Sequence, residues 1–113
     1  MSTKDAARRL RDIVDNAGRI DVYATGLDLD AFAADDKAID ACERCLERIA
    51  GAAVKLGPEQ FAAIAPDVPL ERVRGLGNVL RHAYDDIDLT ILFGLVRNDV
   101  PALRQAALRA LEG

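Results

Sequence analysis

The sequence predicts an all-α protein, and two observations lead to that conclusion. Half of its 113 residues are hydrophobic but only 4% are aromatic, a composition that favours helices over strands. Apolar residues recur at steps of three and four, and no segment shows the sustained alternation of a strand. We expect an antiparallel bundle of about four long helices with one or two short helices. The length predicts a single domain over residues 1–113.

The first half of the chain contains two predicted long helices joined by a short turn. Ser2 and Asp5 form a capping-box pattern before the first helix. Its apolar side comprises Leu10, Ile13, Val14, Ala17 and, toward its end, Ile20 and Tyr23. Asp28 is expected to cap a short turn through Phe32, and either Asp35 or Asp36 to cap the clearest helix of the sequence. One face of that helix carries Ile39, Cys42, Leu46, Ile49, Ala53 and Leu56.

Prolines set the predicted boundaries in the second half. Gly57 and Pro58 end the long helix, and Pro58 suits the start of a short helix over 59–64. Pro69 is expected to begin the next helix, whose apolar stripe comprises Val73, Leu76, Leu80, Ala83, Tyr84 and Ile87. A further element is expected over 88–96. Asn98 or Asp99, followed by Pro101, is then expected to open a final helix that runs through Leu111.

Charge and cysteine content exclude several classes of protein. The net charge is −4 and the pI about 4.9, so any contact with nucleic acid must be local. The best local candidate is the window 72–81, which has three arginines and no acid. Cys42 and Cys45 are too few for a structural zinc site, so we expect two buried thiols, with no metal and no cofactor.

No targeting or membrane segment is expected. The N-terminus leads into a charged helix. The longest strongly apolar run, 91–96, falls far short of the roughly 20 residues that a membrane span needs. We therefore expect a cytoplasmic protein that does not contact a membrane.

The segment 74–85 holds the residues most suited to chemistry. Arg74, Asn78, Arg81 or His82, and Asp85 lie three or four apart, so they share a helix face opposite the apolar stripe. An imidazole titrating near neutrality moves protons between the ribose 2′-OH and the leaving oxygen of RNA, and a nearby guanidinium holds the phosphate. The alternative is an ordinary surface histidine near a helix end.

The chain resembles the HepT-like toxins of the HEPN superfamily. The segment 77–84, which includes Asn78, His82 and Tyr84, is similar to their Arg-Asn-x-x-x-His-x-Tyr signature. The likeness extends along almost the whole chain and includes Ile20-x-x-Tyr23, the long helix 39–57, the approach 69–75 and the segment 99–103. It implies a HEPN-like helical bundle.

The resemblance also implies a function, a partner and a modification. It makes the chain the ribonuclease toxin of a toxin–antitoxin pair, a homodimer whose signature helices line a shared cleft, with a tRNA or mRNA as substrate. His82 would be the catalytic histidine and Asn78 the polar residue of the motif. An antitoxin of the MntA type, a minimal nucleotidyltransferase, would neutralise the toxin by AMPylation of Tyr84, because the added negative charge repels RNA.

Two positions depart from the family pattern. Gly77 replaces the motif arginine, so Arg74 or Arg81 is expected to supply the guanidinium along the same face. Gly51 stands where many relatives carry a glutamate. Gly77 also supports an alternative, a non-catalytic subunit that binds a nucleotide or a nucleotidyltransferase. A third possibility is a purely structural helical dimer.

Overall fold

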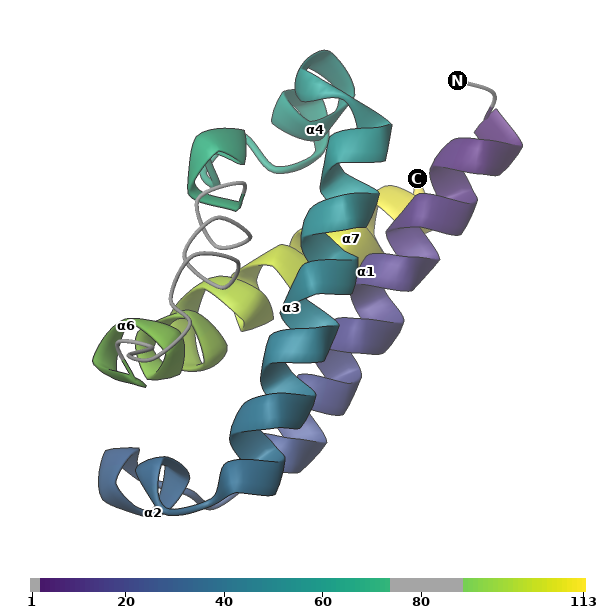
Figure 1. Cartoon of the computed structure of the whole chain (residues 1–113). Coiled ribbons are helices and arrows are strands. Elements are labelled where there is room, and N and C mark those ends of the chain that lie inside the picture. Colours follow the sequence, from purple (N-terminus) through teal and green to yellow (C-terminus); the bar gives the residue numbers. More distant parts are fainter. Residues whose placement is uncertain (1–2, 74–88) are drawn as a thin grey trace.

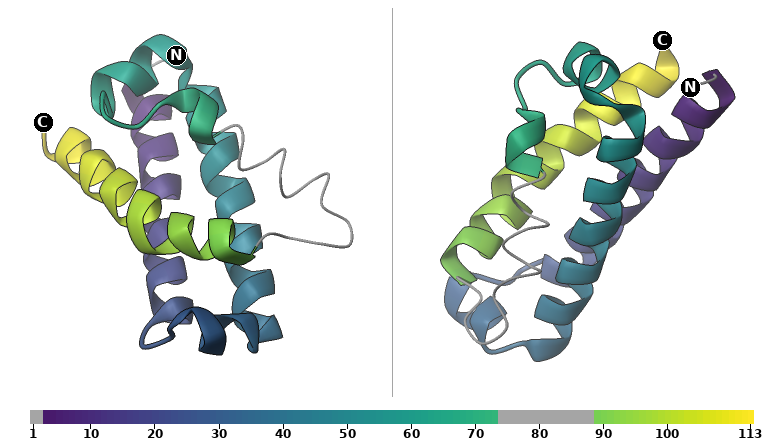
Figure 2. Two further views of the ribbon diagram at one scale, coloured as in Figure 1. Left: turned by 90° about the vertical axis from the view of Figure 1, so that its left-hand side faces the viewer. Right: turned by 45° about the horizontal axis from the view of Figure 1, so that its top comes forward.

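The computed structural model describes residues 3–73 and 89–113, and the regular elements within these ranges are all helical. They are α1 (Thr3–Ala24), α2 (Leu29–Ala33), α3 (Asp36–Leu56), α4 (Pro58–Ile64), α6 (Leu89–Gly94), the π-helical turn η1 (Leu95–Asp99) and α7 (Val100–Glu112). Helices α1 and α3 run side by side in opposite directions, and α7 crosses them obliquely (Figures 1 and 2). The predicted all-α bundle is confirmed.

A single apolar core lies where α1 packs against both α3 and α7. All six residues predicted for the apolar face of α3 are buried, as are Leu10, Ile13, Ala17 and Ile20 of α1. Tyr23 was wrongly placed with them, because its side chain is 41% exposed. At 100° per residue it lies about 100° from the centre of the apolar side of α1. It therefore reaches the margin of the core rather than its interior.

Side-chain caps begin the helices where the sequence predicts them. Asp28 Oδ1 accepts a hydrogen bond of 2.8 Å from the Ala31 N–H at the start of α2. Asp35 Oδ1 accepts one of 3.0 Å from the Ala38 N–H, so Asp35 rather than Asp36 caps α3. Gly57 ends α3 with a φ of 89°, a conformation that favours glycine.

The second half of the chain departs from prediction at one point. No cap separates the final helix from the element before it, since Asp99 is itself helical and its side chain makes no capping hydrogen bond. The chain passes through η1 instead, where the Val100 N–H bonds to the Leu95 carbonyl five residues back. Pro101 has no N–H for the Arg97 carbonyl, and its ring would clash with that carbonyl in a regular α-helix. The wider turn accommodates the proline without a break.

Two smaller expectations can be compared with the structure. Residues 70–73 are helical, as predicted after Pro69, whereas the rest of that helix, 74–88, lies outside the described residues. Cys42 and Cys45 are both buried as free thiols. Within 3–73 and 89–113, no helix is long and apolar enough to cross a membrane.

We predict that Asp35→Ala lowers the free energy of unfolding by about 1 kcal/mol, because the Ala38 N–H loses its cap. Urea unfolding followed by circular dichroism measures the change. Asp36→Ala is the matched control, since it removes a neighbouring carboxylate but no capping bond. An equal or larger loss in Asp36→Ala would contradict the assignment of the cap.

Candidate functional site

All the predicted site residues lie outside the described residues: Arg74, Asn78, Arg81, His82 and Tyr84. The structure instead describes the two places where the segment 74–88 joins the bundle. Val73 precedes the segment and Leu89 follows it. Val73 belongs to the apolar core, and Leu89 packs against it.

The first of these places is anchored in the apolar core. Val73 is only 3% exposed and, with Leu46, Ile49 and Leu103, lines a small apolar hollow between α3 and α7. Beside it, Arg72 Nη1 lies 3.8 Å from Asp99 Oδ1, a link between the start of the segment and the end of η1. Because the aliphatic contact is buried and the ion pair is partly exposed, the apolar contact provides most of the attachment.

The second place is held by aromatic and cationic contacts. On α6, Phe93 packs against Phe32 of α2 with ring centroids 5.4 Å apart. The Arg97 guanidinium lies 5.1 Å from the centre of the Phe93 ring and donates a hydrogen bond to the Leu27 carbonyl. These contacts fix α6 and η1 to the turn after α1. The described residues on both sides of the segment 74–88 therefore belong to packed parts of the bundle.

The sequence did not predict the contacts that Arg72, Asp99 and Arg97 make beside the segment 74–88. The ion pair joins residues far apart in the chain, and nothing in the sequence brings them together. The Phe93–Arg97 contact had a local signal, because residues four apart are neighbours on a helix. That signal is weak, since many such pairs occur on helix surfaces.

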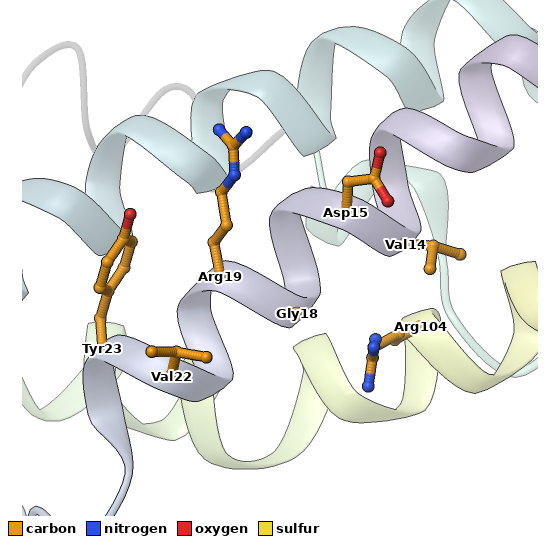
Figure 3. Close-up of a pocket in the computed structure, with 7 residues that line it drawn as sticks. All are labelled: Val14, Asp15, Gly18, Arg19, Val22, Tyr23 and Arg104. Atoms are coloured by element: carbon orange, nitrogen blue, oxygen red, sulfur yellow. The ribbon is translucent and has the colours of Figure 1, made fainter.

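A separate groove of about 490 Å³ lies between α1 and α7. Figure 3 shows Arg19 and Tyr23 on one side of α1 and Arg104 of α7 on the other. The Arg104 guanidinium lies close to the backbone of α1 at Gly18, where a Cβ would be only 3.3 Å from Arg104 Nη2. Asp15 also lines the groove, so its charge is mixed. It has no cluster of groups suited to catalysis.

The two cysteines are unsuited to nucleophilic or metal chemistry. Burial, together with the neighbouring Cys45, Asp35 and Glu43, raises the pKa of Cys42 to about 11. Burial also raises the pKa of Cys45, although nearby arginines oppose the shift. Among the residues that the structure describes, no group of three or more His, Cys, Asp or Glu side chains could hold a metal ion.

Comparison with known proteins identifies relatives over nearly the full chain. Residues 5–110 match the model of the family described as Ribonuclease HepT-like. A Methanocaldococcus jannaschii protein named "Putative RNase" is 31% identical over 105 residues, which cover 93% of this chain and 95% of the relative. A second "Putative RNase" of that organism is 37% identical over 89% of this chain and 83% of its own length. The "Probable ribonuclease HepT" of Thermococcus cleftensis is 30% identical over 84% of this chain and 86% of its own. No solved structure matches the chain significantly.

We predict that Cys42 in the folded protein reacts with iodoacetamide far more slowly than in urea. A pKa of about 11 in place of 9.0 leaves roughly a hundredfold less thiolate at pH 8, and burial blocks access as well. Mass spectrometry of the alkylated peptide over time measures the rate. Rapid modification of Cys42 at pH 8 without urea would contradict the buried thiol.

Proposed function

Because the chain belongs to the HepT-like ribonuclease family, we propose that it is a metal-independent endoribonuclease toxin whose catalytic residue is His82. The observation that carries the proposal is the extent of the family match. It spans residues 5–110 and so includes the segment with Asn78, His82 and Tyr84. The packing of Val73 and Phe93, which lie on either side of that segment in the chain, supports it, since a catalytic group needs rigid neighbours.

The chemistry proposed for His82 is proton transfer. The ribose 2′-oxygen attacks the adjacent phosphorus, its proton passes to the imidazole, and a proton is delivered to the leaving 5′-oxygen. The new bond joins the 2′-oxygen to phosphorus, and the bond from phosphorus to the 5′-oxygen breaks. The products are a 2′,3′-cyclic phosphate and a free 5′-hydroxyl. Histidine suits both transfers because it titrates near neutral pH.

A guanidinium is needed to stabilise the negative charge that develops on the phosphate oxygens. Gly77 cannot provide one, so we assign this role to Arg74 or Arg81, which lie one helical turn from Gly77 or Asn78 if the segment is helical. Asn78 would hold the phosphate or ribose by its amide. The substrate in this proposal is an RNA such as a tRNA or an mRNA.

The proposal includes an assembly and a means of control. Two copies of the chain would form a homodimer whose signature segments line one cleft. A nucleotidyltransferase of the MntA type would transfer AMP to Tyr84 and so neutralise the toxin. The transferred group adds bulk and negative charge beside the cleft, which opposes binding of an RNA backbone.

We predict that the purified, unmodified protein cleaves RNA in the presence of EDTA and that His82→Ala lowers the rate about 10²- to 10⁴-fold, the usual contribution of a general acid–base group. A gel assay with end-labelled RNA measures the rate, and intact mass confirms that Tyr84 is unmodified. Tyr23→Phe is a control at an aromatic side chain outside the proposed site. Undiminished cleavage by His82→Ala would overturn the role of His82.

Arg74→Ala and Arg81→Ala, tested in the same assay, are expected to identify the guanidinium that takes the place of the motif arginine. At least one should slow cleavage about tenfold or more, because a charge-stabilising group is removed. Full activity in both variants would refute this assignment. No cleavage by the unmodified wild-type protein would favour the non-catalytic, nucleotidyltransferase-binding subunit to which Gly77 also points.

A further inference from the structure

Cationic side chains lie along the line where α1 and α3 meet, here called the seam, although the protein is acidic overall. The exposed side of α3 carries acids along one edge, which are Asp36, Asp40, Glu43 and Glu47. Its four bases lie within a sector of about 40° at the other edge, and they are Lys37, Arg44, Arg48 and Lys55. Arg48 and Lys55 line a hollow shared with α1, so the basic edge is the one that borders α1.

This hollow has a volume of about 280 Å³ and is lined by both helices. From α1 come Arg9, Asp12 and Asn16, and from α3 come Arg48, Gly51, Ala52 and Lys55. The lining thus contains three cationic side chains and one carboxylate. Asp12 lies 3.4 Å from Arg9 and offsets that charge in part. Within the described residues, neither Arg48 nor Lys55 has a carboxylate oxygen within 4.0 Å.

Gly51 keeps the space between these cations open. It lies three residues after Arg48 and four before Lys55, so a side chain at this position would project between them. A Cβ at Gly51 would meet nothing within 4 Å, and the φ of Gly51 is not positive. Neither packing nor backbone geometry requires glycine there, although glycine is among the least favourable residues within a helix. Its structural consequence is the open hollow.

A buried amide lies against the same hollow. Asn16 is 7% exposed and is the one polar residue of the described ranges that is buried. Its Nδ2 donates a hydrogen bond of 2.8 Å to the Asp12 carbonyl, whereas Oδ1 has no partner within the described residues. A buried acceptor without a hydrogen bond destabilises the folded protein. Because Oδ1 has almost no accessible surface, a donor held in the hollow could reach it only if the Asn16 side chain turned outward.

Further arginines extend the positive field along the seam. Arg48, Arg19 and Arg44 all lie near enough to Cys45 to lower the pKa of its thiol, against the larger raising effect of burial. Figure 3 shows Arg19 projecting from α1 on the side away from Arg104 of α7. Arg44 is engaged by Glu47 at 2.9 Å. The seam is thus bordered by four cationic side chains, which are Arg9, Arg19, Arg48 and Lys55. Asp12 is the one carboxylate among the residues that line the hollow.

We propose that the hollow at Gly51 is a phosphate-binding site, and that its phosphate is part of the RNA bound by the protein. Guanidinium groups present several donors to phosphate oxygens, and a lysine adds a mobile point charge. The RNA source rests on the proposed function, whereas the phosphate chemistry does not. The site would hold RNA outside the segment 74–88, where cleavage is proposed.

The sharpest test fills the hollow with and without charge. Gly51→Glu places a carboxylate between Arg48 and Lys55, whereas Gly51→Gln places a neutral side chain of nearly the same size there. Both replace a helical glycine by a better helix former, so both should fold. Fluorescence anisotropy with a labelled single-stranded RNA in EDTA, in the His82→Ala background, measures affinity without cleavage. Arg48→Gln/Lys55→Gln is a second variant that leaves the hollow open.

We expect Gly51→Glu to weaken RNA binding about tenfold or more and Gly51→Gln by less than about threefold. In the double variant the slope of log affinity against log salt should become shallower by about 0.7 for each RNA phosphate that the protein no longer neutralises. If Gly51→Glu and the double variant both bind RNA as tightly as the His82→Ala protein does, the assignment to RNA is overturned. A parallel titration of the wild type with AMP, read from the NMR shift of the amide of Ala52, which also lines the hollow, tests the free-nucleotide source.

These outcomes separate the two proposals. A shift with AMP that is abolished by Gly51→Glu, without any effect on RNA affinity, would keep the phosphate site and assign it to a free nucleotide. No response to either probe would overturn the site. Loss of RNA affinity in Gly51→Glu, together with no cleavage by the wild type, would keep the site while the ribonuclease proposal fails.

Discussion

The packing of α1 against α3 is the interaction on which the rest of this structure depends. Ile13 and Ile20 from α1 and Leu46 and Ile49 from α3 are each only 1% exposed. Burial of each side chain contributes roughly 1.5–3 kcal/mol, and the described residues include no disulfide that could take the place of this core. Small residues such as Ala17 and Ala53 are also buried in the same core, which permits close packing of the helices.

Helix α3 of this pair contacts the residue before the candidate catalytic segment and also lines the proposed phosphate site. The candidate catalytic segment begins after Val73, which packs beside Leu46 and Ile49 of α3. The proposed phosphate site lies at the outer margin of the α1–α3 contact, where Arg48 and Lys55 border α1. An acidic protein can bind RNA in this way because local clusters of cations, rather than the net charge, make the contacts.

Local sequence signals predicted the helices well. Asp28 and Asp35 cap helices through their own side chains, and the buried stripe of α3 follows the periodicity of its apolar residues. The π-helical turn was missed because it depends on how the chain accommodates Pro101 without ending the helix. Tyr23 was misplaced because its angular position lies at the margin of the apolar side of α1. Asp35 and Asp36 were equally good caps in sequence, and only backbone geometry separates them.

One of the two candidate sites could be predicted from the sequence and the other could not. His82, Asn78 and Tyr84 were predicted from a local motif, and their roles remain proposals because they lie outside the described residues. The hollow at Gly51 could not be predicted, since Arg9 and Arg48 meet only when α1 and α3 pack together. The departure at Gly51 was visible in the sequence, but its consequence required the neighbouring helix. The cations of α3 share one helix face and could be read from its periodicity, whereas Arg9 of α1 joins them only through tertiary packing.

The most direct test of the central claim is cleavage of an RNA by the unmodified protein in EDTA, compared with the same sequence carrying 2′-O-methyl groups. We predict that RNA is cut to products ending in a 2′,3′-cyclic phosphate and that the methylated strand is bound but not cut. Cleavage of the methylated strand would show that the 2′-oxygen is not the nucleophile and would contradict the proposed chemistry of His82.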